Sequence, residues 1–221
     1  MTAVAEYQVP SVAGPEGQPH GSIGQATSSW CGSRGKRALD AVGAVVLAAA
    51  LWPVALCAAL AVLVDSGWPV IYSQVRLGRG LRPFVVYKFR TMRRDAERLT
   101  GPVLAAVGDP RVTRVGRFLR VTRVDELPQL LNVLRGEMSL VGPRPERPSF
   151  VSQFMRTIPG YVGRYEMVPG LTGPAQVAES YHATPEQKLI HDLHYRAHAS
   201  VWYDFRVLLA TVGVVVRCGG R

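Results

Sequence analysis

The sequence is poor in cysteine, and the three cysteines that it has stand far apart. They are Cys31, Cys57 and Cys218, an odd number with none of the short spacings that bind zinc. This excludes a disulfide framework or a structural zinc site as the basis of the fold, and it favours a reducing compartment. Residues 1–33 lack the apolar core of a signal peptide and are rich in Gly, Pro, Ser and Gln. We expect them to form a flexible polar tail that stays on the protein.

Acidic residues are scarce relative to basic ones. The 221 residues include 16 Asp and Glu against 26 Lys and Arg, which gives a formal net charge of +10. This excess predicts an anionic partner: nucleic acid, an anionic membrane surface or a phosphorylated substrate. Residues 76–147 alone hold 16 basic and 7 acidic side chains, a difference of +9. The positive charge is therefore concentrated where an anion-handling site would need it.

A long apolar run without a charged residue extends from Ala41 to Val64. Because a bilayer core takes about 20 apolar residues, this run predicts a membrane-embedded helix over residues 34–66. Basic residues, which favour the cytoplasmic side, flank the run at both ends. Pro53 lies at its middle and removes a backbone hydrogen bond, which bends a helix. We therefore expect a re-entrant segment with its hinge at Pro53; the alternative is a single span with a tolerated proline.

Residues 67–221 are predicted to form a small, mainly helical cytoplasmic domain. Val70–Val75 and Phe84–Phe89 favour a β-hairpin, because both are rich in β-branched and aromatic residues and two glycines separate them. Helices are expected at Arg93–Gly101, Gly108–Val124, Thr184–Ser200 and Val201–Val216. The second and the last of these are amphipathic and suit a membrane interface with anionic headgroups. The predicted fold class is α+β: a re-entrant helix-break-helix hairpin in the membrane plus this cytoplasmic domain.

Asp125 and Glu126 stand side by side in a region rich in arginine. One interpretation is structural: Asp125 caps a helix that ends at Gly136, and Glu126 is favourable in its first turn. The other interpretation is chemical. The surrounding arginines keep both carboxylates ionised, so that one can attack a phosphorus atom while its neighbour holds Mg²⁺. The residues alone leave both interpretations open.

Arg144 is the central residue of the segment Gly142–Glu146. Pro143 and Pro145 fix the backbone φ angle on either side of it, so its side chain projects from a stiff backbone. The planar guanidinium group suits bidentate contact with phosphate. We predict that Arg144 binds phosphate; the alternative is a surface turn with a solvated arginine.

Three segments, "YKFRTMRRDAE", "DELPQLLNVLRGEMSLVGPRPE" and "PGLTGPAQV", follow the proline-containing apolar helix in that order. The chain thus resembles the bacterial sugar transferases, which are monotopic polyprenyl-phosphate phosphoglycosyltransferases, over residues 34–216. The resemblance implies transfer of a sugar 1-phosphate from a nucleotide diphosphate sugar, expected to be a UDP-sugar, to a polyprenyl phosphate such as undecaprenyl phosphate. A nucleoside monophosphate is released. Such a step begins the membrane stage of exopolysaccharide or glycoconjugate biosynthesis.

The resemblance also implies a re-entrant helix, Mg²⁺ as cofactor, a covalent aspartyl phosphosugar and the cytoplasmic face of the bacterial inner membrane. By position, Asp125 is the implied nucleophile. Glu126 binds Mg²⁺, with Asp125 as a further ligand, or assists proton removal. Arg144, Lys88 and Arg90 are the implied contacts of the substrate phosphates.

Two positions depart from the family pattern. Arg123 stands where several relatives have serine, and Pro174 stands where many have an aromatic residue, so both bear on substrate choice. Since only a polar tail precedes the apolar helix, the minimal catalytic form of the family is expected.

The alternative function is that of a membrane-tethered basic protein that binds nucleic acid or anionic lipid without catalysis. It predicts nothing special at Asp125. Binding of single-stranded nucleic acid would also require aromatic side chains for base stacking. The arginine-rich segment has few aromatic residues beyond Phe118, so nucleic acid is not expected as a partner. The identity of the sugar, the prenyl chain and the oligomeric state, a homodimer included, stay open.

Overall fold

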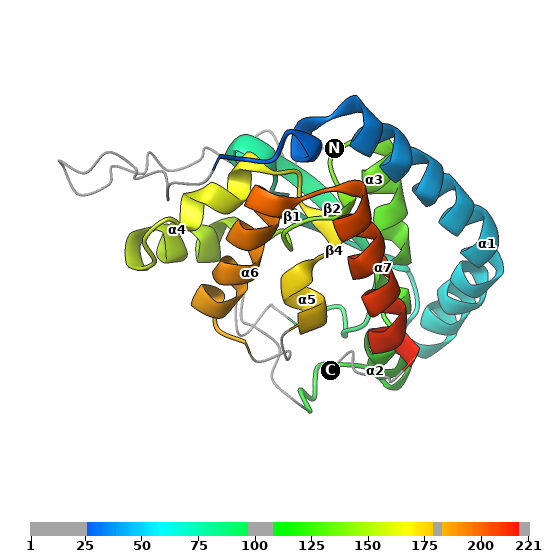
Figure 1. Ribbon diagram of the computed structural model, residues 1–221. Coiled ribbons are helices and arrows are strands. Elements are labelled where there is room, and N and C mark those ends of the chain that lie inside the picture. The colour runs from blue at the N-terminus through cyan, green and yellow to red at the C-terminus, as the bar shows by residue number, and fades with distance from the viewer. Residues whose placement is uncertain (1–25, 97–107, 179–182, 217–221) are drawn as a thin grey trace.

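A computed structural model describes residues 26–96, 108–178 and 183–216. The elements in chain order are η1 (Ser29–Gly32), α1 (Arg34–Ser66), β1 (Ile71–Leu77), η2 (Arg79–Leu81), β2 (Pro83–Phe89), α2 (Arg114–Val121), η3 (Val124–Gln129), α3 (Leu130–Arg135), β3 (Ser139–Val141), α4 (Pro148–Thr157), η4 (Tyr161–Glu166), β4 (Gly170–Thr172), α5 (Pro174–Ala178), α6 (Pro185–His198) and α7 (Val201–Val216), where η marks a 3-10 helix. Helices surround two small two-stranded sheets (Figure 1), so the α+β class is confirmed.

The apolar segment forms one helix, α1, with the bounds expected for the membrane segment. The expected break is wrong, because the helix continues through Pro53. A proline removes one hydrogen bond, and the neighbouring turns hold the helix together around it. The chain instead follows a curved path around one side of the molecule (Figure 1). Of the described residues, only α1 is long and apolar enough to cross a membrane.

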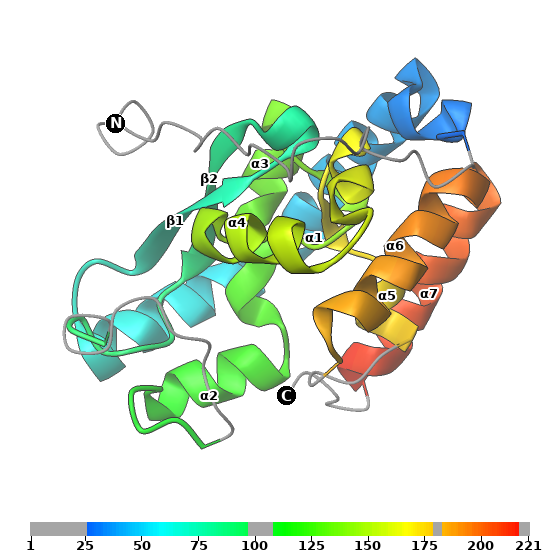
Figure 2. The same ribbon diagram turned by 90° about the vertical axis from the view of Figure 1, so that its left-hand side faces the viewer.

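The predicted β-hairpin is confirmed: β1 and β2 pair antiparallel, with Tyr72 opposite Lys88. Figure 2 shows this hairpin beside α3 and α4. The second sheet was not predicted; β3 and β4 pair in parallel, although each has only three residues. A Cβ atom on Gly170 would lie 2.1 Å from the backbone nitrogen of Gly142, so this pairing requires glycine.

The helices near the carboxyl end are confirmed. A capping box at Thr184 starts α6 as expected, and α7 has the predicted bounds. The arginine-rich helix is shorter than expected, because α2 begins only after its N-cap Thr113. Most of the helix predicted at Arg93–Gly101 lies outside the described residues.

The last part of the predicted polar tail is structured, which moves the boundary of the tail. The backbone nitrogen of Ser28 donates to the carbonyl oxygen of Arg196 at 2.7 Å, and the Ser28 hydroxyl donates to that of Ala199 at 2.7 Å. Residues 29–32 form η1, which contributes Cys31 to the core. The prediction of a flexible tail was therefore wrong for residues 27–33. Residues 1–25 lie outside the described part of the chain.

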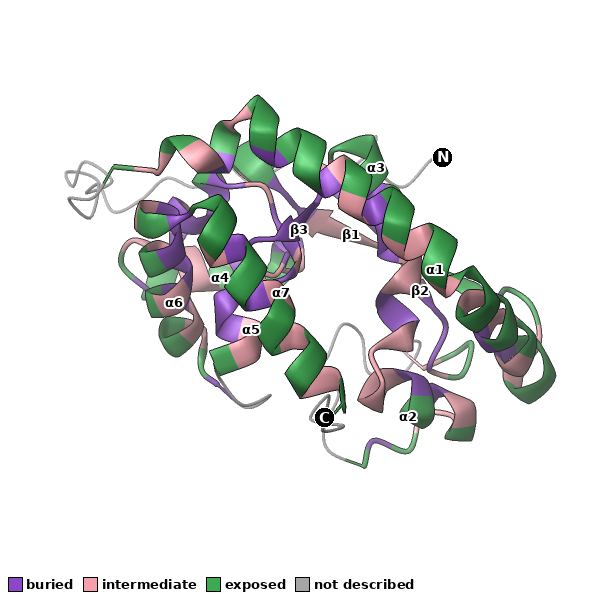
Figure 3. Cartoon of the chain, turned by 45° about the vertical axis from the view of Figure 1, so that its right-hand side comes forward, coloured by how far each residue is buried: buried purple, intermediate pink, exposed green. Residues whose placement is uncertain are grey.

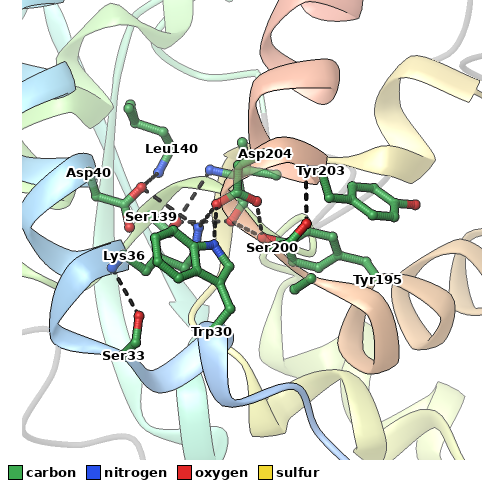
Figure 4. Close-up of polar contacts among 12 residues, drawn as sticks. Trp30, Ser33, Lys36, Asp40, Ser139, Leu140, Tyr195, Ser200, Tyr203 and Asp204 are labelled. Carbon is green, nitrogen blue, oxygen red and sulfur yellow. Dashed lines mark hydrogen bonds and ion pairs between the residues drawn. The ribbon is translucent and has the colours of Figure 1, made fainter.

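A buried charge cluster joins the start of α1 to α7. Figure 4 shows Trp30, Lys36 and Tyr195 converging on the carboxylate of Asp204, which is 1% exposed. Oδ2 of Asp204 accepts from Nζ of Lys36 and from Nε1 of Trp30, each at 2.8 Å, and the Tyr195 hydroxyl donates to Oδ1. On the other side of Lys36, Asp40 lies 3.8 Å from Nζ. One buried lysine thus balances two buried carboxylates.

Replacing Lys36 by Met should therefore destabilise the fold. Removing one member of a buried ion pair typically costs about 3–5 kcal/mol, because the remaining charge is buried without compensation. The measurement is thermal unfolding of the purified protein in detergent. Arg34→Met, two positions earlier on the exposed side of α1, is the matched control and should unfold like the native chain. Equal unfolding temperatures for the two variants would contradict the prediction.

Candidate active site

The acidic pair lies on η3. This 3-10 helix begins directly after a residue in the left-handed backbone region. Arg123 has φ 60° and ψ 11°, which residues other than glycine seldom adopt. The prediction that Asp125 caps the helix ending at Gly136 is wrong, because α3 begins only at Leu130. Pro128 lies inside the tighter 3-10 turn that precedes it. The predicted end is confirmed: Gly136 has φ 81° and closes α3.

Glu126 is the point on which the cations of the site converge. Its Oε1 atom lies 2.7 Å from Nζ of Lys88 and 2.8 Å from Nη2 of Arg144. Nη1 of Arg123 is 4.0 Å from the same oxygen. The Glu126 carboxylate is buried, whereas about a third of the Arg144 side chain is exposed. The residues predicted at positions 88, 126 and 144 are therefore brought together from three separate segments.

Asp125 differs from its neighbour in having no hydrogen bond or close ion pair with any described residue. It is 7% exposed, and within the described ranges no side chain or backbone group hydrogen-bonds to its carboxylate. Neither oxygen of Asp125 is among the fully enclosed polar atoms without a partner in the described ranges, so the carboxylate retains contact with solvent. The Asp125 carboxylate is therefore available to contact a ligand or a substrate.

The two carboxylates also differ in their acidity. Burial and the adjacent charge of Glu126 raise the pKa of Asp125 to about 6, against the opposing effect of Lys88, Arg144 and Arg120. Burial would raise the pKa of Glu126 as well, but Arg144 and Lys88 hold it well below its ordinary value. The cations thus favour the ionised form of Glu126, whereas burial and the neighbouring charge disfavour the ionised form of Asp125. Glu126 is therefore the carboxylate that holds Lys88 and Arg144. Asp125 is the carboxylate that no described group hydrogen-bonds.

The position of Lys88 depends on Asn132, a fully buried residue of α3. Its Nδ2 atom donates to the carbonyl oxygen of Val85 at 2.6 Å, and its Oδ1 atom accepts from the backbone nitrogen of Tyr87 at 3.3 Å. Both partners belong to β2. Asn132 therefore sets the strand against η3 and α3 so that Lys88 reaches Glu126. The sequence carried no signal for this role.

Arg90 does not join the acidic pair, although it was expected near the site. Its Nη2 atom donates to the carbonyl oxygens of Ser66 and Gly67, so it binds the end of α1. Arg120 is the arginine that was missed. It was predicted only as part of a membrane-facing helix, yet its Nε atom donates to Oγ1 of Thr91 at 2.8 Å and its charge acts on Asp125.

The oxygen donors of the pair suit Mg²⁺. This ion prefers oxygen ligands and is commonly held by one or two carboxylates together with substrate phosphates. The Asp125 carboxylate is available, and the three cations around Glu126 all approach Oε1. In the described part of the chain no cluster of three or more acidic, His or Cys side chains could hold a metal. The remaining ligands would therefore have to come from substrate phosphates and water.

Comparison with known proteins identifies the family. The family model described as bacterial sugar transferase matches residues 31–218, nearly the whole chain. The chain belongs to the bacterial sugar transferase family. The match includes every residue of the site and also α1, so the apolar helix and the acidic pair are parts of one family domain.

Several relatives of this sugar transferase carry names that state a reaction. It is 46% identical over 184 residues to the UDP-glucose:undecaprenyl-phosphate glucose-1-phosphate transferase of Caulobacter vibrioides (strain ATCC 19089 / CIP 103742 / CB 15), covering 80% of this chain and 68% of that protein. It is 42% identical over 184 residues to the UDP-N-acetylgalactosamine-undecaprenyl-phosphate N-acetylgalactosaminephosphotransferase of Aeromonas hydrophila, covering 82% of this chain and 43% of that protein. Exopolysaccharide production protein PSS of Rhizobium leguminosarum bv. phaseoli is 39% identical over 185 residues, covering 80% of this chain and 92% of that protein.

The chain thus spans less than half of the Aeromonas protein but nearly all of the Rhizobium protein. The two named reactions differ in their sugar, glucose in one relative and N-acetylgalactosamine in the other. Both share a UDP-sugar and undecaprenyl phosphate. What the relatives have in common is therefore the class of reaction rather than the sugar.

Proposed function

We propose that the protein transfers a sugar 1-phosphate from a UDP-sugar to undecaprenyl or a similar polyprenyl phosphate at the cytoplasmic face of the inner membrane. The observation that carries the proposal is the Asp125 carboxylate, which no group of the described residues hydrogen-bonds, directly beside a Glu126 that two cations hold. A free carboxylate in a positively charged site can attack phosphorus and form an acyl phosphate. Membership of the sugar transferase family supports this chemistry over simple anion binding.

The first step forms a bond between a carboxylate oxygen of Asp125 and the phosphorus that carries the sugar. The bond from that phosphorus to the bridging oxygen of the diphosphate breaks, and the nucleoside monophosphate leaves with the electron pair. In the second step an oxygen of the polyprenyl phosphate attacks the same phosphorus. The bond to Asp125 breaks, so the carboxylate is restored and a polyprenyl diphosphate sugar is the product.

The surrounding residues of the chain contribute charge and orientation. Arg144 and Lys88 place positive charge beside the point where the phosphate oxygens gather negative charge, in a site of limited solvent exposure. Glu126 orients both cations, since each contacts its Oε1 atom. A bound Mg²⁺, held by Glu126 and Asp125, would supply further charge neutralisation for the diphosphate.

The experiment that tests the proposal is release of nucleoside monophosphate from a panel of UDP-sugars by the purified full chain with Mg²⁺ and polyprenyl phosphate. With at least one UDP-sugar we expect sustained release of nucleoside monophosphate. This turnover should require the polyprenyl phosphate. Binding to anionic vesicles without release from any sugar would instead favour the alternative, a basic membrane-binding protein without catalysis.

The membrane placement that we propose is re-entrant, and contacts at both ends of α1 support it. Near its start, Arg37 donates to the carbonyl oxygens of Val133 and Leu134, each at 2.6 Å. At its other end, Arg90 donates to the carbonyl of Ser66 at 2.7 Å. A straight helix of 33 residues would be about 50 Å long, far more than the roughly 30 Å of a bilayer core. Because both ends of α1 contact the same domain, the helix is expected to enter and leave the membrane on the same side.

The remaining surfaces suit a bilayer. Figure 3 shows long exposed stretches on α1 and α7. Large apolar side chains cover them, including Val46, Trp52 and Leu60 on α1 and Trp202 and Val212 on α7. Apolar surface of this extent marks a membrane or protein contact. On α2, the exposed Phe118 lies among arginines that would meet anionic headgroups.

Cysteine labelling in sealed vesicles tests the topology. Single cysteines at Gly32 and Ser73, which flank α1, are introduced after the native cysteines have been replaced, and each is labelled with an impermeant maleimide. Both should react from the same face. Reaction of the two from opposite faces would show a spanning helix. Pro53→Leu should straighten α1 and shift part of the population toward that second pattern.

A further inference from the structure

The loop that carries Arg144 cannot be secured by its own backbone donors. Pro143 and Pro145 have no N–H group, so two of the three residues around the guanidinium offer only carbonyl oxygens. A loop of this kind keeps one conformation only if donors from elsewhere reach those carbonyls. The structure supplies them.

Four consecutive carbonyl oxygens of the loop each accept a hydrogen bond, and the four donors come from three other segments, β1, η4 and β4. The carbonyls of residues 143 and 146 accept from the backbone nitrogens of Gly170, at 2.8 Å, and Leu77, at 3.1 Å. The carbonyl of residue 145 accepts from Nη1 of Arg76 at 3.1 Å. The carbonyl of Arg144 itself accepts from Nη2 of Arg164 at 3.0 Å. The active-site arginine is thus held through its backbone by a second arginine.

Besides its bond to the loop, Arg164 contacts one buried carboxylate and two tyrosine rings. It is 3% exposed, and its Nη2 atom lies 2.8 Å from Oδ2 of Asp192, a fully buried residue of α6. Its Nη1 atom donates to the Tyr161 hydroxyl, and its guanidinium carbon lies 5.0 Å from the centre of that ring. The rings of Tyr161 and Tyr165 both pack against this cation, and their centres lie 6.2 Å apart. Such a buried charge is costly unless it is paired and hydrogen-bonded, and Asp192 provides the pairing.

We infer that Arg164, held by Asp192 and Tyr161, is a positioning residue that sets the guanidinium of Arg144 against Glu126. The inference rests on the proposed function, since it assigns the cause of the Arg144 geometry in that same site. Arg164 contacts neither the acidic pair nor its lysine, so its effect must pass through the backbone of Arg144.

The test begins with a measurement that needs no catalysis. Phenylglyoxal modifies arginine side chains, and peptide mass spectrometry reports the rate at Arg144. In the native full chain the 2.8 Å contact with Glu126 should slow modification of this side chain. Arg164→Met should remove part of the protection and speed the modification of Arg144. Arg156→Met, an exposed arginine of α4, is the control and should leave the rate unchanged.

The second measurement is kcat/KM for nucleoside monophosphate release. A misplacement of about 1 Å costs roughly 10²-fold in rate, so Arg164→Met should lose activity on that scale. Arg164→Lys should restore part of it, because an ammonium group can donate to the Arg144 carbonyl but cannot bridge to Asp192 and Tyr161 together. In the Arg144→Ala background, Arg164→Met should cause no further loss, since coupled sites are not additive.

Two outcomes would overturn the inference. One is an unchanged rate of Arg144 modification in Arg164→Met. The other is a double variant whose loss of kcat/KM equals the product of the losses in the two single variants, which would indicate that Arg164 acts independently of Arg144 and is only structural. If Arg164→Met fails to fold, Asp192→Asn takes its place and should give a smaller increase in Arg144 modification. A protein that releases no monophosphate at all would refute the proposed function, while the modification rates would still decide the role of Arg164.

Discussion

Replacing Asp125 by Asn is expected to lower the rate of nucleoside monophosphate release by roughly 10³-fold or more, the scale of losing a catalytic nucleophile. That factor corresponds to about 4 kcal/mol of activation free energy. The amide keeps the size of the carboxylate but has no anionic oxygen with which to attack phosphorus. Since no described group hydrogen-bonds to the Asp125 carboxylate, the folded structure should lose little.

The controls for Asp125 separate chemistry from stability. Asp109 is equally buried, at 7% exposure, but is paired with Arg111, so Asp109→Asn should lose stability and keep the covalent step. Glu126→Gln should keep the nucleophile and still lose most turnover, because Lys88 and Arg144 lose the anion that orients them. Turnover of Asp125→Asn close to that of the native chain would remove Asp125 from the mechanism.

Replacing Arg144 by Ala is expected to lower turnover by about 10²–10³-fold, the usual effect of removing one preorganised donor from a site that stabilises developing charge. Its guanidinium lies 2.8 Å from Glu126 with about a third of its side chain exposed, so one edge can meet a substrate phosphate. Arg144→Lys should recover only part of the rate, because a single ammonium group cannot make a bidentate contact. Steady-state kinetics with the best UDP-sugar provides the measurement.

Arg135 offers the matched control for Arg144. It is an exposed arginine in the last turn of α3, and its Nη1 atom donates to the Tyr87 hydroxyl at 3.0 Å. Arg135→Ala changes the net charge by the same amount as Arg144→Ala and should leave turnover nearly native. Equal activity of the Arg144→Ala and Arg135→Ala variants would make Arg144 a surface residue, as the alternative interpretation of its turn requires.

Local chemistry explains the parts of the fold that the sequence predicted. The capping box at Thr184, the glycine at the end of α3 and the hairpin all follow from residues close together in the chain. The bounds of α1 follow from its charged flanks. The continuation of α1 through Pro53 did not follow, because a proline weakens a helix without always ending it.

The site could be predicted in its residue types but not in its complete geometry. Lys88 and Arg90 are both basic and two positions apart, and only the packing of α1 against β2 sends one to Glu126 and the other to Ser66. The hydrogen bond from Arg164 to the carbonyl of Arg144 has an acceptor that every residue possesses, so no sequence pattern marks it. The same applies to the three-residue strands β3 and β4, which are too short to show periodicity.

The covalent step is tested most directly by the intact mass of the protein after mixing with UDP-sugar and Mg²⁺ without a polyprenyl phosphate. An adduct with the mass of one sugar phosphate should appear on the native chain, with release of an equal amount of monophosphate. It should map to the peptide that contains Asp125, disappear when polyprenyl phosphate is added, and be absent from Asp125→Asn. An adduct on another peptide, or rapid turnover with no adduct at any time, would contradict nucleophilic attack by Asp125.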